Sequence, residues 1–533
     1  MIEYGTAQDR LRKLLDVCPD AISHGCLIGL EKESLRVTAD GDIAQTPHPR
    51  ALGSALTNRY ITTDFSEALL EFITPPCASA REALACMSNI HRFAYAHLGD
   101  ELLWATSMPC KVAGDASVPI AEYGTSNVGT MKHVYRRGLS YRYGRLMQAI
   151  AGVHFNYSLP QSLWSAYQKL LGNRGPLPRF VSDGYFGLIR NFQRQGWLLP
   201  YLFGSSPGVC KSFLGNAPGE LEEFDTGSWF QPHATTLRMS DIGYRNKNQA
   251  SLRISYDDVD AYIESLTRAI ETRNPDYEAI GVVVDGEYRQ LNANLLQIEN
   301  EYYSFIRPKR VARSGEKPTV ALAERGVEYV EVRALDVSAT DPNGFNEDQM
   351  RFLEAFLLLC ALCDSDRIGA DEQREIDYNQ QLVATRGRQP GLELQRRGRT
   401  VALREWAEEI CAGLEGICDL LDAGDADAPY ARALDDQRRA VADPSRLPSA
   451  RMLSEMKAAD ESFFQYAMRL SREHRDYFRR TRLSDEKRER FEAEASRSLA
   501  AQRDIEATDT VSFPEYLESY FKQSAVRTRE PST

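Results

Sequence analysis

The chain has 533 residues, of which 43% are apolar and 26% are charged. These proportions are typical of a soluble globular protein and exclude an intrinsically disordered or collagen-like chain. No stretch of 18 consecutive apolar residues occurs, so we expect no membrane partner. The formal net charge is −12 at pH 7, which disfavours a nucleic-acid partner because a phosphate backbone is held by positive charge.

The N-terminus and the cysteines both indicate a cytoplasmic protein. The opening residues carry charges where a secretory signal would need an apolar segment. Most of the ten cysteines lie in apolar contexts, where a free thiol packs as a small hydrophobic group. We therefore expect reduced thiols, including Cys360 and Cys363, whose C-x-x-C spacing in a leucine-rich segment indicates core packing.

Strand and helix signals are mixed in the first part of the chain. A helix is expected at about 7–17, and strands over 26–37 and 69–76. Ser79 is a candidate N-cap for the next helix. A further helix is predicted over 130–150, and it is followed by a strand that stops at Pro160.

The second part of the chain becomes helical. Asp285 and Gly286 fit the turn of a hairpin, because this dipeptide accepts positive φ. Segments 295–306 and 327–337 alternate as strands do, whereas the chain from Asn346 onward reads as almost wholly helical. Early strands and late helices predict an α+β fold with an antiparallel sheet. We expect residues 1–365 to contain the sheet. Residues 366–533 are expected to form a helical region that packs on the sheet, so that the two parts make one continuous structural unit.

Glu31 and Glu33 are the first candidates for chemistry. They are two residues apart in a predicted strand, so their side chains project from the same face. Two carboxylates at about 6–7 Å repel each other unless a cation or water lies between them. The alternative is the hydrated face of an ordinary antiparallel sheet, and these two residues alone do not decide between the readings.

The same arrangement recurs along the chain, with polar residues on one face of a predicted strand and apolar residues on the other. The polar faces carry Glu71; His154, Asn156 and Ser158; Gln297, Glu299, Glu301 and Tyr303; and Tyr329, Glu331 and Arg333. A sheet with one such face predicts the floor of a site. Carboxylate oxygens with one imidazole suit Mg²⁺ or Mn²⁺ better than zinc.

Nucleotide-binding motifs are absent from the sequence. It contains no glycine-rich phosphate loop. A nucleotide would therefore be held through metals and arginines rather than by backbone amides. The candidate cations are Arg238, Arg307, Lys309, Arg310 and Arg333.

Six segments, in this order, closely resemble the proteobacterial type of glutamate–cysteine ligase, the first enzyme of glutathione synthesis. They are GLEKESLRV, ITTDFSEALLEFITP, YGTSNVG, GVHFNYSLP, LQIENEYYSFIRPKR and EYVEVRALD. The resemblance extends from about residue 25 to about residue 365, and it is specific because several separate segments agree. Residues 1–365 are therefore expected to be the catalytic region.

The resemblance implies a glutamine-synthetase-like antiparallel sheet that is curled into a funnel and flanked by helices. ATP, glutamate and cysteine would meet over its concave face. The positions that match the family's Mg²⁺ ligands are Glu31, Glu33, Asp64, Glu71, His154 and Glu331. Arg238 matches an arginine for a substrate carboxylate and Arg333 one for the transferred phosphate. Together with Glu331, these arginines are the expected catalytic residues.

The resemblance also implies a pocket for cysteine, formed by Tyr135, Tyr244 and Tyr303 with Gln148 nearby. Tyr135 and Gln148 are thirteen residues apart, about 220° around a straight helix. They can therefore face one pocket only if the helix ends between them.

The implied reaction begins with attack of the glutamate γ-carboxylate on the γ-phosphate of ATP. The cysteine amine then displaces phosphate from the resulting acyl phosphate. Metals and arginines are the main requirement, because two anions must approach each other. We expect Mg²⁺, with Mn²⁺ as an alternative, and a monomer; feedback inhibition by glutathione is left open.

Three other functions remain open. The chain could be a related carboxylate–amine ligase that joins glutamate to another amine, which the pocket tyrosines alone do not exclude. Clustered carboxylates also suit a metal-dependent phosphohydrolase, although its substrates would not need the arginine and tyrosine set. A non-catalytic nucleotide-binding scaffold is disfavoured, because every expected metal position is filled.

Overall fold

The computed structural model describes residues 4–19, 25–214, 219–243 and 252–525. Its centre is an antiparallel sheet in the order β11-β12-β5-β1-β3-β2, with β4 paired to β1. The predicted antiparallel sheet is therefore confirmed. Its strands are β1 (Leu27–Val37), β2 (Ile61–Thr63), β3 (Leu69–Ile73), β4 (Leu102–Leu103), β5 (Gly152–Ser158), β11 (Ile306–Lys309) and β12 (Tyr329–Asp336).

The register of this sheet sets the positions of the polar side chains. Glu31 of β1 is paired with His154 of β5, and Glu33 with Glu71 of β3. Glu331 of β12 is paired with a residue of β5 two positions from His154. Side chains of directly paired residues, and of residues two apart on one strand, project from the same side of a sheet. All these side chains therefore leave the sheet on one face.

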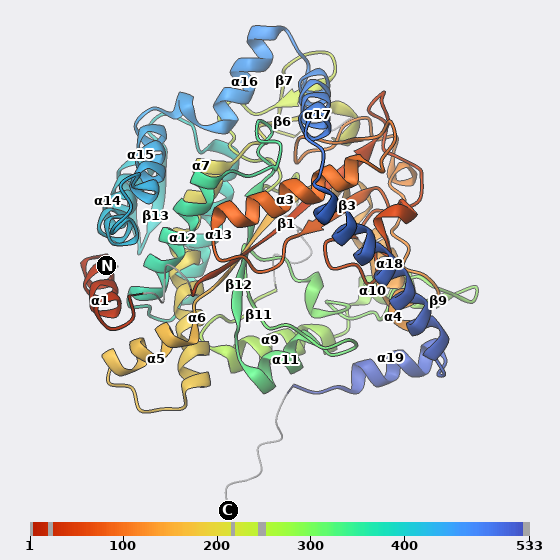
Figure 1. Cartoon of the computed structure of the whole chain (residues 1–533), viewed down its shortest axis with the longest axis horizontal. Helices are drawn as coiled ribbons and strands as arrows, with labels where there is room; N and C mark the ends of the chain where they lie inside the picture. The colour runs from red at the N-terminus through yellow and green to blue at the C-terminus, as the bar shows by residue number, and fades with distance from the viewer. Residues whose placement is uncertain (1–3, 20–24, 215–218, 244–251, 526–533) are drawn as a thin grey trace, which may run out of the picture.

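The opposite face of the sheet is mainly apolar, although β1 also places the buried Lys32 and Arg36 there. Helices cover the sheet (Figure 1). Leu30, Phe155 and Val332 are almost completely buried on the mainly apolar face. The helices that contact the strands include α3 (Ala80–Tyr95), α6 (Leu177–Gln195) and α7 (Leu198–Phe203), and α12 (Glu347–Leu362) packs on α3 and α6. Burial of the apolar face fixes which face of the sheet remains for chemistry.

The remaining helices surround this core. They are α1 (Tyr4–Val17), α4 (Asn127–Tyr143), α5 (Gln161–Leu170), α8 (Lys211–Leu214), α9 (Val259–Glu271), α10 (Pro275–Ile280), α11 (Pro318–Arg325), α13 (Ala370–Arg386), α14 (Leu403–Leu421), α15 (Pro429–Ala442), α16 (Pro448–Ala459), α17 (Phe463–Arg480), α18 (Asp485–Thr508) and α19 (Phe513–Lys522). No helix within the described ranges is long and apolar enough to cross a membrane.

Two local predictions are confirmed. The Ser79 hydroxyl accepts the backbone N–H of Glu82 at 3.2 Å and so caps α3. Asp285 and Gly286 have φ of 53° and 82° and connect β9 (Val283–Val284) to β10 (Glu287–Tyr288). Positive φ at both turn residues matches the twist of the two strands.

One local prediction is wrong, and the predicted mostly helical C-terminal region is confirmed with one exception. The segment expected to be a strand over 295–306 contains a 3-10 turn, η5 (Glu299–Glu301), and pairs only from Ile306 onward. The helical C-terminal region is interrupted by a hairpin of β13 (Glu393–Arg396) and β14 (Arg399–Ala402). Its turn residues Arg397 and Gly398 both have positive φ. The turn was missed in the sequence because arginine is not a residue that usually marks such a turn.

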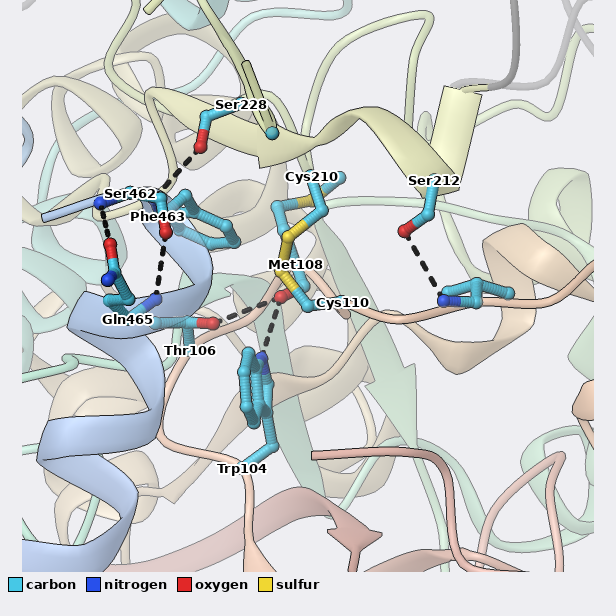
Figure 2. Close-up of a disulfide and its surroundings, with 12 residues drawn as sticks. Trp104, Thr106, Met108, Cys110, Cys210, Ser212, Ser228, Ser462, Phe463 and Gln465 are labelled. Carbon is cyan, nitrogen blue, oxygen red and sulfur yellow. Dashed lines mark hydrogen bonds between the residues drawn. A yellow bond between two sulfur atoms is a disulfide. The ribbon is translucent and has the colours of Figure 1, made fainter. Parts of the chain in front are cut away.

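The prediction that all cysteines are free is also wrong. Cys110 and Cys210, which are 100 residues apart, form a disulfide with a Cα–Cα distance of 5.3 Å. Figure 2 shows it beside the N-terminus of α17, where the Phe463 N–H donates to Ser228 Oγ at 2.9 Å. The other eight cysteines are free thiols. Spacing could not reveal this pair, because only the tertiary fold brings the two cysteines together.

Candidate active site

Three adjacent strands place Glu31, His154 and Glu331 in one cluster. His154 Nδ1 lies 3.0 Å from Glu31 Oε2 and 4.0 Å from Glu331 Oε1. One possible ligand atom from each residue lies within 4.8 Å of those of the other two. Two carboxylates and an imidazole at this separation fit the oxygen-rich coordination that Mg²⁺ or Mn²⁺ prefers.

Glu33 and Glu71 continue this acidic face. Burial, and then the charge of Asp64, raises the pKa of Glu33 to about 8. Burial and the charges of Glu31, Asp64 and Glu33 raise the pKa of Glu71 well above its ordinary value. Crowded carboxylates that resist ionisation are what a bound cation would relieve, so these residues also fit a divalent metal.

The charge of Glu331 is neutralised differently. Lys309 Nζ and Arg333 Nη1 each lie 3.1 Å from its carboxylate. Burial alone would raise the pKa of Glu331, but Lys309 and Arg333 together hold it well below its ordinary value. Glu331 is therefore ionised at neutral pH, and its carboxylate also fixes the position of the Arg333 guanidinium.

A pocket of about 120 Å³ opens beside these carboxylates. Most of the residues predicted from the sequence line it, namely Glu33, Asp64, Tyr135, Gln148, His154, Arg238, Tyr303 and Arg333. Glu31, Glu71 and Glu331 lie in the sheet beside the pocket and do not line it. Tyr244 lies outside the described residues. A larger hollow of about 520 Å³ elsewhere contains none of the predicted residues.

Tyr135 and Gln148 can face one pocket only if the helix ends between them, and the structure meets this condition. Helix α4 ends at Tyr143, and Gly144 follows with φ of 80°. A short 3-10 turn, η3 (Leu146–Ala149), then carries Gln148. Because the helix ends between them, both side chains line the same pocket.

Arg238 is held rigidly at the other side of the pocket. Its side chain is 1% exposed, and Nη1 lies 3.9 Å from Asp336 Oδ1. Nη2 donates to the backbone carbonyl of Arg333 at 3.1 Å. Gly152 permits this approach, because a Cβ at that position would overlap the guanidinium. The two arginines thus form one cationic wall facing the carboxylates.

Several pocket residues were not predicted. They are Phe65, Arg136, Leu139, Tyr143, Met147 and Asn300. Leu139 and Tyr143 follow Tyr135 at intervals of four, so the face of one helix could have revealed them. Arg307 was recognised only as a general candidate cation. Glu301 was predicted to lie with Tyr303 on the polar face of a strand, and both line the pocket although a 3-10 turn replaces that strand.

Carboxylates, an imidazole and guanidinium groups around one pocket define an enzyme that handles phosphate and carboxylate groups together. Comparison with known proteins identifies the family. A family model described as glutamate–cysteine ligase matches residues 11–383. The chain is 48% identical over 519 residues to a glutamate–cysteine ligase of Alcanivorax borkumensis, covering 96% of this chain and 99% of that protein.

Two further comparisons agree. A glutamate–cysteine ligase of Pseudomonas putida is 49% identical over 495 residues, which are 93% of this chain and 94% of that protein. The crystal structure of a glutamate–cysteine ligase from Francisella tularensis in complex with AMP superposes with a TM-score of 0.88. It is 38% identical, and the match covers 93% of this chain and 97% of that one. The chain therefore belongs to the glutamate–cysteine ligase family and is a ligase.

Proposed function

We propose that this enzyme uses ATP to join the γ-carboxylate of L-glutamate to the amine of L-cysteine, giving γ-glutamylcysteine, ADP and phosphate. This reaction is the first step of glutathione synthesis. One observation carries the proposal: the Glu31–His154–Glu331 cluster adjoins a pocket whose lining includes Arg238 and Arg333 as well as Tyr135 and Tyr303. Metal-bound phosphates, an amino-acid carboxylate and a small amine each have matching groups there.

We propose that Glu31, Glu33, Asp64, Glu71, His154 and Glu331 hold Mg²⁺ or, as an alternative, Mn²⁺. When bound, the metal would neutralise phosphate charge as the phosphoryl group moves. Arg238, buried and immobile, is proposed to orient a substrate carboxylate through its planar fork. Arg333, fixed by Glu331, is proposed to stabilise the transferred phosphoryl group. These two arginines and Glu331 are the proposed catalytic residues.

The proposed acceptor side of the pocket contains Tyr135, Tyr303, Gln148 and, by resemblance alone, Tyr244. Aromatic walls would exclude water from the acyl phosphate and would pack against the small thiol side chain. Glutathione contains the γ-glutamylcysteine unit, so we propose that it competes for the same pocket as a feedback inhibitor. We further propose a cytoplasmic monomer in which residues 1–365 are catalytic and residues 366–533 pack on them.

A panel of acceptor amines tests this proposal against a ligase for another amine. Purified protein with ATP, Mg²⁺ and glutamate would be supplied in turn with cysteine, 2-aminobutyrate, leucine or lysine, and the products identified by mass spectrometry. We expect cysteine and, less efficiently, 2-aminobutyrate to be ligated, because the pocket selects by size. Better ligation of leucine or lysine than of cysteine would contradict the proposal.

A further inference from the structure

The outer surface of α4 is covered by α19, the last helix within the described residues. Met131 and Val134 of α4 form one apolar cluster with Leu517 and Tyr520 of α19 and with Leu291. Figure 1 shows α18 leading into α19 along the side of the molecule where α4 lies. The pattern of the sequence gave no role to these last helices.

Tyr135 joins this cluster to the pocket. It lies one residue after Val134, packs against the cluster as a half-buried side chain, and also lines the pocket. Leu139 and Tyr143 follow on the same face of α4 and line the pocket as well. Helix α4 therefore separates the pocket from α19, and its position depends on what packs behind it.

The N-terminal end of α4 is fixed by the end of α18 and by the segment that follows it. The Asp509 carboxylate accepts the backbone N–H of Asn127, the first residue of α4. The Asn127 side-chain amide donates to the Val511 carbonyl at 3.0 Å, and the Thr125 N–H donates to Glu506 Oε1 at 3.0 Å. A carboxylate at a helix N-terminus is favourable because it satisfies free N–H groups and complements the helix dipole.

The C-terminal end of α19 is fixed at a second point. Lys317, which is 4% exposed, donates from Nζ to the carbonyl oxygens of Phe521 and Gln523, both at 3.0 Å. The Lys317 N–H donates to Gln523 Oε1 at 3.1 Å. A cation at these carbonyls stabilises the end of the helix. Helix α19 is thus anchored at both ends and spans the back of α4.

We propose that α19 is a positioning element for the acceptor side of the pocket, and that Leu517 and Tyr520 act through α4 on Tyr135. This inference rests on the proposed role of Tyr135 in binding cysteine. Loss of the Leu517 side chain would leave a cavity behind α4, into which the helix can relax. A small displacement of a pocket wall changes reaction rates strongly, because bound groups lose their alignment.

The test compares Leu517→Ala with a matched control, Leu470→Ala. Both leucines are 6% exposed, but Leu470 lies on α17, which contacts α3, β4 and β6 (Gly208–Cys210). For Leu517→Ala we expect about a five- to twentyfold rise in the KM for cysteine and more ADP per γ-glutamylcysteine. The KM for glutamate should change less than about twofold. Leu470→Ala should lower the melting temperature without moving either kinetic quantity.

Two outcomes would overturn the proposal. One is an unchanged cysteine KM in Leu517→Ala while Tyr135→Ala raises it, which would leave the proposed function intact. The other is an unchanged cysteine KM in Tyr135→Ala, which would refute the role of Tyr135 and with it the positioning by α19. If Leu517→Ala does not fold, Leu517→Val removes less volume and supplies the same comparison.

Discussion

Glu33 and Glu71 are direct neighbours across β1 and β3, and the pKa of each is raised by burial and by surrounding carboxylates. When both acids are ionised, their repulsion lowers the free energy of unfolding, and a divalent cation bound between them would remove that repulsion. The free energy of unfolding therefore falls as pH rises through their raised pKa values, because the folded state then has to release protons that it retains at lower pH.

Replacement of Glu71 by glutamine should therefore stabilise the protein in the absence of metal. We expect a gain of about 1 kcal/mol at pH 8, with a smaller gain at pH 5, because the wild-type carboxyl is protonated there. Mg²⁺ should raise the melting temperature of the wild type more than that of Glu71→Gln. Glu354→Gln, which alters a buried carboxylate on α12, serves as the control and should keep the full response to Mg²⁺.

Glu331→Gln should have the opposite effect on stability. Its carboxylate is the ion-pair partner of Lys309 and Arg333, so an amide would remove the negative charge that contacts both cations. We expect a loss of about 1–3 kcal/mol without metal, together with loss of Mg²⁺-dependent turnover. Melting curves and ADP release measure the two effects. Near-normal turnover at saturating Mg²⁺ would remove Glu331 from the proposed metal site.

The two arginines should be distinguishable by kinetics. Arg238→Lys replaces a planar fork with a point charge, so it should chiefly raise the KM for glutamate. Arg333→Lys should chiefly lower kcat, because its proposed partner is the phosphoryl group during transfer. Steady-state kinetics with each substrate varied in turn would separate these effects. If both variants raise only the KM for ATP, the two roles are assigned wrongly.

Glu354 predicts a pH dependence that does not involve the site. It is 8% exposed, and burial raises its pKa to about 7 despite the charge of Arg351. Because the pKa of Glu354 is raised in the folded state, ionisation of this carboxyl lowers the free energy of unfolding as pH rises. The loss is absent below about pH 4.5 and complete above about pH 7. Glu354→Gln should gain about 2–3 kcal/mol at pH 8 and almost nothing at pH 4.5. Denaturant unfolding at the two pH values measures the gain, and equal gains at both would refute this account.

Strand periodicity made part of the site predictable. A period of two places Glu31 and Glu33 on one face whatever the rest of the fold does, and the same holds for Glu331 and Arg333. The strand predicted over 295–306 was wrong, because a 3-10 turn covers Glu299–Glu301, yet Glu301 and Tyr303 both line the pocket.

Contacts between distant segments were not predictable. The pairing of Cys110 with Cys210 and the packing of α19 against α4 depend on where the whole chain brings those segments. No local pattern encodes such contacts, since alternation and capping describe only a few neighbouring residues. For the same reason, the sequence could state only on which condition Tyr135 and Gln148 would face one pocket. The end of α4 at Gly144 meets that condition.

The most direct test of the central claim is the yield of ADP from purified protein with ATP and Mg²⁺, measured with both amino acids and with each omitted. The account predicts one ADP for each γ-glutamylcysteine when glutamate and cysteine are both present, and little ADP when glutamate is absent. Release of ADP at the same rate without glutamate would contradict the account, because the pocket would then serve a phosphohydrolase.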